Sequence, residues 1–222
     1  MSEQPGVQVA RATFEMARPG LLATADALVD DPATAVDDAA ARFDGMIPEL
    51  AYLDRPDVPM AEPLFQCTVA LALYLALADR GVEIHDFGAA FTVQFAALAE
   101  HLPEAPYEYD EKLMAAADES QRSERPGEFV FEVIAADDKG AWGVNILSCA
   151  ICHQFSKHGA MDLVPYMCAG DDVLSDRFDQ GLRRTGTIAL GAHRCDFRYH
   201  PGGEPLRVAD QYPERIRLGT TR

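Results

Sequence analysis

The chain has 222 residues, of which 48% are hydrophobic and 25% are charged, a usage typical of globular proteins that argues against disorder over most of the length. The formal net charge is −17, and residues 1–120 hold only 6 Lys and Arg against 22 Asp and Glu, so we expect neither nucleic acid nor an anionic membrane as a partner. The longest apolar run, residues 67–78, is shorter than the roughly 20 residues that cross a bilayer, and the N-terminus lacks the pattern of a signal peptide, which predicts a cytoplasmic protein.

The first half of the sequence is predicted to be helical. An Ala-rich stretch, residues 7–30, is interrupted at Pro19-Gly20, where we expect one helix to end and another to begin. The next helix, residues 33–46, follows Asp31, whose side chain can cap its N-terminus. Residues 62–80 are apolar on most sides and are predicted to form a central buried helix. Two further helices are expected over residues 84–101 and 108–121.

The second half changes to the pattern of β-strands. Residues 129–134 and 141–147, separated by an Asp-Asp-Lys-Gly turn, predict a hairpin. A helix is expected over residues 148–158, with Ser148 as its N-cap, and two more strands over residues 185–190 and 194–200.

These elements together predict an α+β fold. We expect a helical N-terminal half packed on an antiparallel sheet, with one inserted helix in the C-terminal half. The whole chain, residues 1–222, is predicted to be a single domain. Within it, residues 1–122 form the helical layer, residues 123–200 the sheet and site region, and residues 201–222 a tail.

Cysteine is the residue type that points most directly to chemistry. Five cysteines, an odd number in a chain expected in a reducing compartment, favour free, catalytic or metal-bound thiols over disulfides. Alternation along the last strand places Cys195, Phe197 and Tyr199 on one face, and Asp196 and Arg198 on the other. The thiol therefore faces an apolar side, and groups that activate it must come from other elements.

Other candidate residues lie on the inserted helix and after it. Cys149 and His153 are four residues apart, the spacing of a thiol and its base on one helix face, although a buried Cys beside a surface His has the same spacing. Residues 168–172 have the composition of a turn, from which Asp171 could reach a pocket or simply remain solvated. Thr185 and Thr187 share one face of a predicted strand that begins after Arg184, and this polar face is either the solvent side or a substrate wall.

A zinc site is a weaker interpretation of the same cysteines. Cys149, Cys152, Cys168 and Cys195 could supply four ligands, but a single Cys-x-x-Cys pair on a helix is a weak signal. We predict no metal and no cofactor. The sequence contains no phosphate-binding glycine loop, nucleophile elbow or His-Glu-x-x-His motif.

The order of these residues resembles a known family. The elements that carry the resemblance are Cys149 followed by Gly159, Cys168-x-x-Asp171, Arg184-Thr185-x-Thr187, and Gly191-x-x-x-Cys195-Asp196-Phe197-Arg198-Tyr199, with supporting stretches at residues 46–52 and 71–81. Together they resemble the L-2-amino-thiazoline-4-carboxylate hydrolases from about Phe43 to Tyr199. The resemblance implies hydrolytic ring opening at a C–N bond of a small cyclic amidine that bears a carboxylate.

Roles follow as hypotheses. Cys195 is the expected nucleophile, with Cys149 or Cys168 as the alternatives. Asp171 is the expected general acid or base, and Arg184 is expected to pair with the substrate carboxylate. Thr185, Thr187 and His193 complete the expected substrate-binding set. Where the family tends to carry an acidic residue on the helix after the first cysteine, this chain has His153, which leaves the identity of the ring open.

Two other functions remain as alternatives, a non-catalytic small-molecule-binding domain and a zinc-dependent hydrolase that uses the cysteines as ligands. In each case the expected partner is a small molecule, a small carboxylate if the protein is the ring-opening enzyme. Whether the chain forms a homo-oligomer is left open.

Overall fold

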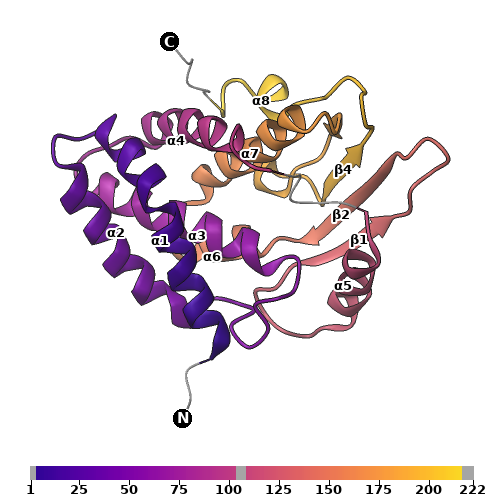
Figure 1. The fold of residues 1–222 in the computed structure, drawn as a ribbon, viewed down its shortest axis with the longest axis horizontal. Helices are drawn as coiled ribbons and strands as arrows, with labels where there is room; N and C mark the ends of the chain where they lie inside the picture. The colour runs from indigo at the N-terminus through magenta and orange to yellow at the C-terminus, as the bar shows by residue number, and fades with distance from the viewer. Residues whose placement is uncertain (1–3, 104–108, 217–222) are drawn as a thin grey trace.

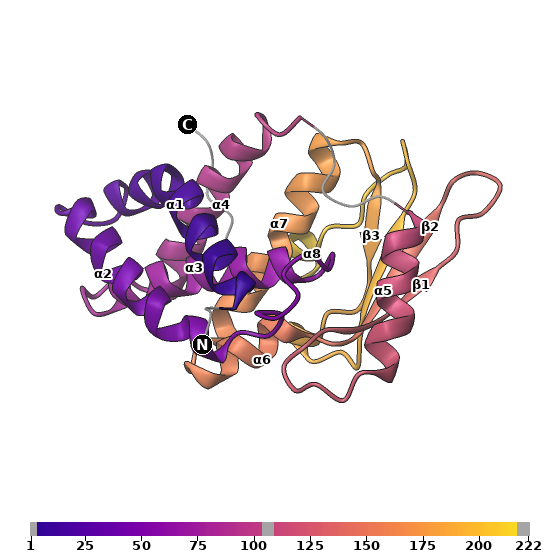
Figure 2. The same cartoon turned by 60° about the horizontal axis from the view of Figure 1, so that its bottom comes forward.

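The computed structural model describes residues 4–103 and 109–216. The first four helices occupy one side of the molecule, and an antiparallel sheet from the second half occupies the other, with the fifth helix packed beside the sheet (Figures 1 and 2). The predicted α+β fold is confirmed. The helices are α1 (Pro5–Asp26), α2 (Pro32–Met46), α3 (Ala61–Ala78), α4 (Ile84–Ala99), α5 (Glu111–Arg122), α6 (Ala150–Lys157), α7 (Val164–Arg177) and α8 (Val208–Gln211). The strands are β1 (Val130–Ile134), β2 (Trp142–Ser148), β3 (Leu182–Arg184) and β4 (Cys195–Tyr199).

The sheet has the strand order β1-β2-β4-β3, and every neighbouring pair is antiparallel. The predicted hairpin is present as β1 and β2. In the register of β2 with β4, Ile146 lies opposite Cys195 and Val144 opposite Phe197. Because opposite residues of an antiparallel pair share a face, these four side chains form one continuous surface.

The central helix of the helical layer is α3, as predicted. Its apolar residues are buried on most sides, and α1, α2, α4 and α6 all pack against it. By length and composition alone, Ala61–Ala78 could cross a membrane, but 61% of this stretch is buried inside the protein. Its hydrophobicity is therefore explained by its position in the core.

The predicted break at Pro19 is wrong, because α1 runs without interruption from Pro5 to Asp26. A proline inside a helix removes one backbone hydrogen bond. Here the residues on both sides of it, Ala10 and Phe14 before and Leu21 and Ala25 after, are buried in the same core. Burial along both halves outweighs the local cost and keeps the helix continuous.

Two local predictions near the site are also wrong. Residues 168–172 do not form a turn but lie inside α7, since this helix buries Tyr166 and Ala169 and its acidic residues find a buried partner. Residues 185–190 do not form a strand, because β3 ends at Arg184. Beyond it, the Asp196 carboxylate accepts the backbone N–H groups of Thr185 and Gly186 at 2.8 and 2.5 Å, which turns the chain away from the sheet into a short 3₁₀ helix, Ile188–Leu190.

The segment after β4 folds back onto the domain over its described part, to residue 216. Leu206 forms a parallel bridge with Arg183. In the helix α8, Val208 and Ala209 are buried, and the later residue Ile216 is buried too. Residues 201–216 therefore contribute to the core rather than extending away from it.

Candidate functional site

A cavity with a volume of about 190 Å³ lies between the helices and the sheet. Its walls come from α3, α4 and α7 on one side and from β2 and β4 on the other, and most of the lining residues are apolar. Four of the five cysteines lie on these walls: Cys67, Cys149, Cys168 and Cys195. Among the described lining residues, Asp171 is the only acidic side chain and Arg184 the only basic one.

Cys195 shares one face of β4 with two aromatic residues, as strand alternation predicted, and this face lines the cavity. Phe197 and Tyr199 line the cavity beside it. On the opposite face of β4, Asp196 binds Thr185, and Arg198 donates to the Asn145 side chain at 2.9 Å. The Cys195 thiol is thus separated from its charged sequence neighbours.

The Cys195 thiol is only 5% exposed, and this burial raises its pKa to about 11. Two features oppose the rise: the backbone N–H of Ile188 donates to Sγ at 3.3 Å, and the positive charge of Arg184 lies nearby. At neutral pH the group is a thiol rather than a thiolate, so a nucleophilic role requires a base in the cavity.

The fully buried Arg184 forms an ion pair with the partly exposed Asp171 at the end of the cavity formed by α7 and β3. Nη1 of Arg184 donates to Asp171 Oδ2 at 2.8 Å, and Nη2 donates to the Cys168 carbonyl oxygen at 2.6 Å. The guanidinium also lies over the Phe197 ring, 4.6 Å from its centroid. Its Nε is buried and has no hydrogen-bond partner among the described residues. Burial raises the pKa of the Asp171 carboxyl, while the charge and hydrogen bond of Arg184 lower it.

A second carboxylate, which the sequence did not single out, also faces Arg184. Asp172 Oδ1 lies 3.8 Å from Nη2 of Arg184, and Oδ2 accepts the backbone N–H of Val208 at 2.8 Å. Burial raises the pKa of Asp172 to about 6. The sequence does not indicate that Asp172 lies beside Arg184, because this contact depends on how β3 packs against α7.

The other thiols on the walls are held in different surroundings. Cys149 is the N-cap of α6, and its Sγ accepts the backbone N–H of Cys152 at 3.4 Å. The hydrogen bond with the Cys152 side chain, followed by burial, raises the pKa of Cys149. Burial is the first cause that raises the pKa values of Cys168 and Cys67. Because β2 continues through Ser148, the predicted Ser148 cap is replaced by Cys149.

Four of the predicted site residues do not reach the cavity. His153 is exposed and packs against Gly127, since Cys149 caps the helix from outside and does not share a helical face with it. His193 is exposed in the loop before β4. The Thr185 hydroxyl donates to Asp196 at 2.5 Å, and Thr187 is buried away from the lining.

Several lining residues were missed from the sequence. Gln66 and Cys67 come from α3, Phe91 and Phe95 from α4, and Trp142 from the start of β2. Gln66 and Cys67 interrupt the apolar sequence of α3, and this interruption could have indicated a cavity. The positions of the aromatic residues could not, because aromatic residues of an ordinary core have the same pattern.

The zinc alternative finds no site in the described part of the chain. No group of three or more His, Cys, Asp or Glu side chains there could hold a metal ion. The cysteines on the walls are spread over α3, α7, β4 and the N-terminus of α6, rather than gathered at one point.

The structure defines an α+β protein with a cavity between its helices and its sheet, and thiols and a carboxylate–guanidinium pair line this cavity. Residues 84–199, from the start of α4 to the end of β4, match the family model of L-2-amino-thiazoline-4-carboxylic acid hydrolase. This match spans more than half of the chain, and the protein belongs to that hydrolase family. No curated protein and no solved structure matches the chain.

Proposed function

We propose that the protein is a hydrolase that opens a C–N bond in a small cyclic amidine bearing a carboxylate, with Cys195 as the nucleophile. Membership of the family supports a hydrolase. One observation carries the finer proposal: a thiol, a carboxylate with a raised pKa and a guanidinium line the same small cavity. These are the groups that nucleophilic attack on an amidine carbon requires.

The charges on the cavity wall fit a ligand that carries one positive and one negative group. The formal charges of Asp171 and Arg184 cancel, so a ligand with an amidinium group and a carboxylate adds no net charge to the cavity. Asp171 accepts hydrogen bonds from the amidinium nitrogens, and the positive charge of Arg184, whose side chain is fully buried behind the cavity wall, attracts the carboxylate. In a cavity with few other polar groups, these contacts fix the orientation of the ring.

The first step forms a bond between Sγ of Cys195 and the amidine carbon. The Asp171 carboxylate accepts the thiol proton, and the electron pair of the C=N bond moves to the ring nitrogen. Asp171 then returns the proton to that nitrogen, so the adduct is formed without net proton change. Burial raises the pKa of the Asp171 carboxyl, which favours its accepting and returning a proton in this exchange.

Ring opening and hydrolysis complete the cycle. The ring C–N bond breaks with its electron pair on nitrogen, which leaves as an amine after protonation. Water then adds to the remaining carbon, the bond to Cys195 breaks, and the thiol regains its proton, so the product gains one water. In a thiazoline the same adduct can expel the ring sulfur instead, and this route liberates a thiol rather than an amine.

Replacing Cys195 by alanine is the direct test. We expect Cys195→Ala to reduce turnover of 2-amino-thiazoline-4-carboxylate at least about 1000-fold, because the nucleophile is lost. Cys152→Ala is the matched control, since Cys152 does not line the cavity. Chromatography with mass detection measures the product, and a thiol-specific reagent distinguishes C–N from C–S cleavage. Full activity of Cys195→Ala would remove this residue as the nucleophile.

A non-catalytic binding domain is the second candidate, supported by the raised pKa values of the thiols on the cavity wall. Buried neutral thiols react slowly with electrophiles. Iodoacetamide labelling at neutral pH separates the two functions. Rapid labelling of Cys195 that a small carboxylate prevents supports the enzyme, whereas uniformly slow labelling supports the binding domain.

A further inference from the structure

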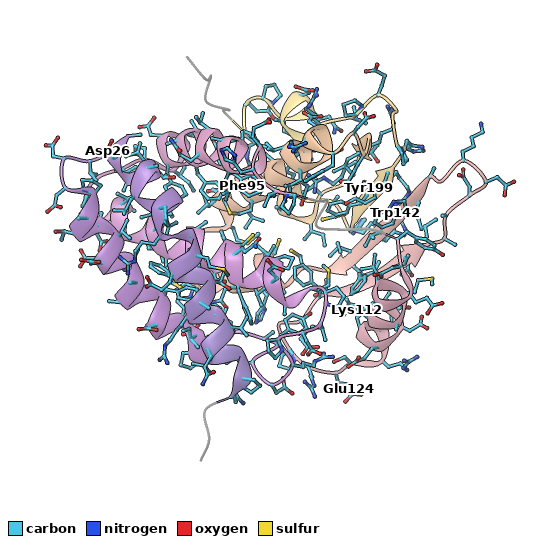
Figure 3. The ribbon with its side chains drawn as sticks, in the orientation of Figure 1. Asp26, Phe95, Lys112, Glu124, Trp142 and Tyr199 are labelled. Atoms are coloured by element: carbon cyan, nitrogen blue, oxygen red, sulfur yellow. The ribbon has the colours of Figure 1, made fainter. Side chains whose placement is uncertain are left out.

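Two rows of aromatic side chains face the cavity from opposite walls. On α4, Phe91 stacks on Phe95 with centroids 6.0 Å apart and planes within 16°. On the sheet, Trp142 stacks on Tyr199 at 4.4 Å, and Phe197 follows at 6.4 Å. All five rings line the cavity. Figure 3 labels Phe95 beside the helical layer and Trp142 and Tyr199 on the sheet.

No ring contact joins the two rows among residues 4–103 and 109–216. Each row is stacked within itself, and the cavity occupies the space between them. The flat faces and edges of these rings are the surfaces that attract another flat ring. The walls therefore form an aromatic slot, defined here by Phe91, Phe95, Trp142, Phe197 and Tyr199.

The slot is adjacent to the charged pair. A Cβ at Gly170 would lie 3.2 Å from Cε1 of Phe95, so the absence of a side chain at this position lets the ring pack directly on α7. The next residue on α7 is Asp171. On the opposite wall, the Arg184 guanidinium lies over Phe197. A single ligand can therefore contact the charged pair and the aromatic slot at once.

The lining of the cavity points to a ligand with an apolar group as well as charged groups. A closed apolar cavity of about 150 Å³ holds benzene, and this cavity has about 190 Å³ with a mostly apolar wall, so a flat ring can lie between the aromatic walls. Contact with these walls adds apolar burial to the contacts that the ligand makes with the charged pair.

We propose that the preferred substrate carries a flat apolar group, such as a phenyl ring, on the amidine ring. This group occupies the aromatic slot while the amidine and carboxylate meet Asp171 and Arg184. The inference rests on the proposed function for the reacting end of the ligand. Phe95, Phe91 and Trp142 then act as specificity-determining residues for the substituent.

Binding can be measured without turnover, because Trp142 is the single tryptophan of the chain and lines the cavity. In the Cys195→Ala protein, Trp142 fluorescence is titrated with 2-amino-thiazoline-4-carboxylate and with its 5-phenyl derivative. We expect the phenyl derivative to bind at least about tenfold more tightly, through apolar contact and ring stacking. Equal affinities, or weaker binding of the phenyl derivative, would overturn the inference.

Conservative variants show which residues are responsible for the tighter binding of the phenyl derivative. Phe95→Leu should reduce the affinity ratio of the two ligands about fivefold or more, since a flat wall is lost while apolar volume is kept. Phe178→Leu is the matched control, because Phe178 lies at the end of α7 outside the cavity and should leave the ratio unchanged. A ratio that is insensitive to Phe95 contradicts the assignment of the slot.

Turnover separates this inference from the proposed function. If the unsubstituted ring is hydrolysed as fast as the phenyl derivative and binds equally well, the function holds and the inference fails. If the phenyl derivative binds tightly but neither ring is opened, the slot is supported and the proposed hydrolysis fails.

Discussion

Arg184 is the largest of the fully buried side chains among the described residues. Two aspartates of α7 and one carbonyl of the same helix surround its guanidinium. A buried guanidinium is stable only where its donors and charge are compensated. The same contacts hold Asp171 on the cavity wall, so folding and the proposed chemistry depend on one ion pair.

Removing this cation should destabilise the fold. We expect Arg184→Met to lower the free energy of unfolding by about 3–5 kcal/mol at neutral pH, because Asp172 would remain buried, and Asp171 partly buried, without their cation. Urea unfolding followed by circular dichroism measures the change. Arg183→Met is the matched control: Arg183 is the neighbouring residue of β3 and is exposed, so its loss should cost no more than about 1 kcal/mol.

Replacing Asp171 in the Arg184→Met protein shows whether the loss of stability comes from the unpaired charge of Asp171 or from the packing of Arg184. Asp171→Asn combined with Arg184→Met should recover part of the lost stability, since one uncompensated charge is removed. If the double variant is no more stable than Arg184→Met, the loss comes from packing of the arginine rather than from the unpaired carboxylate.

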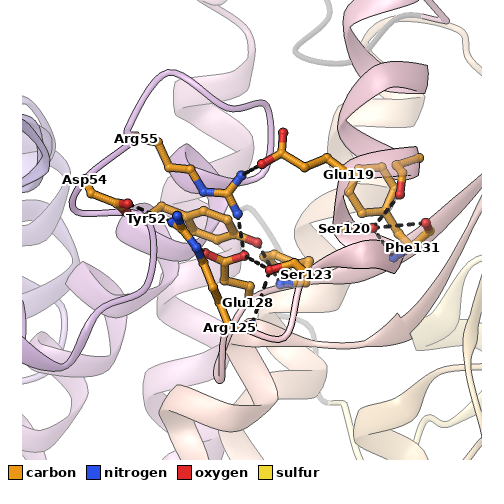
Figure 4. A network of polar contacts seen from close by, with 11 residues as sticks. Tyr52, Asp54, Arg55, Glu119, Ser120, Ser123, Arg125, Glu128 and Phe131 are labelled. Carbon is orange, nitrogen blue, oxygen red and sulfur yellow. Dashed lines mark hydrogen bonds and ion pairs between the residues drawn. The ribbon is translucent and has the colours of Figure 1, made fainter.

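At the scale of elements, a polar network ties the segment before α3 to α5 and β1 (Figure 4). Arg55 binds both Glu119 of α5 and Glu128, which precedes β1. Tyr52 accepts the backbone N–H of Phe129 at 2.7 Å through its hydroxyl, and its own backbone has a φ of 67°. Phe129 lines the cavity, so this network fixes one side of the site from outside.

Removing Arg55, the cation that pairs with the buried Glu128, should destabilise the protein. Glu128 is only 5% exposed, and we expect Arg55→Met to reduce the free energy of unfolding by about 2–4 kcal/mol because this carboxylate loses its cation. Arg125→Met is the matched control, since Arg125 and Asp54 are each about half exposed and such pairs contribute at most about 1 kcal/mol. Similar losses for the two variants in urea unfolding would contradict a special role for Arg55.

A comparison of the elements with the sequence shows which sequence patterns are enough to predict local structure. The β1–β2 hairpin and the buried α3 were predicted because alternation and continuous hydrophobicity reflect burial directly. The face of Cys195 followed from alternation within one strand. The continuity of α1 through Pro19 and the helical state of residues 168–172 were missed, because packing of distant segments decided both. For the same reason the sequence indicated Arg184 and Asp171 as site residues but not their mutual ion pair.

At the scale of the whole molecule, the acidic excess lies on the helical layer. The five arginines of residues 4–103 all form ion pairs with acidic side chains: Arg11, Arg18, Arg42, Arg55 and Arg80. Nearly half of the acidic residues in the same stretch form no ion pair with a described residue, so a negative excess remains on this surface. Like charges on one surface repel over about 10 Å at moderate salt, and this repulsion opposes the compact state.

Asp26 offers a direct measure of this repulsion. It is the last residue of α1 and exposed, and its side chain has no hydrogen bond or ion pair to another residue of the described chain. Its negative charge also lies at the negative end of the helix dipole. Figure 3 labels it at the helical end of the molecule, well apart from Phe95, Trp142 and Tyr199, so changes there should leave the site intact.

We expect Asp26→Lys to raise the free energy of unfolding by about 0.5–1 kcal/mol at about 20 mM salt, because it reverses one charge both on the acidic surface and at the helix C-terminus. The gain should shrink by about half or more near 500 mM salt, where screening shortens the reach of the charges. Asp26→Asn, which only removes the charge, should give about half the gain with the same salt dependence. Urea unfolding at the two salt concentrations measures all three proteins. A gain that is independent of salt would mean that local helix propensity, rather than the charge of the whole helical layer, is responsible.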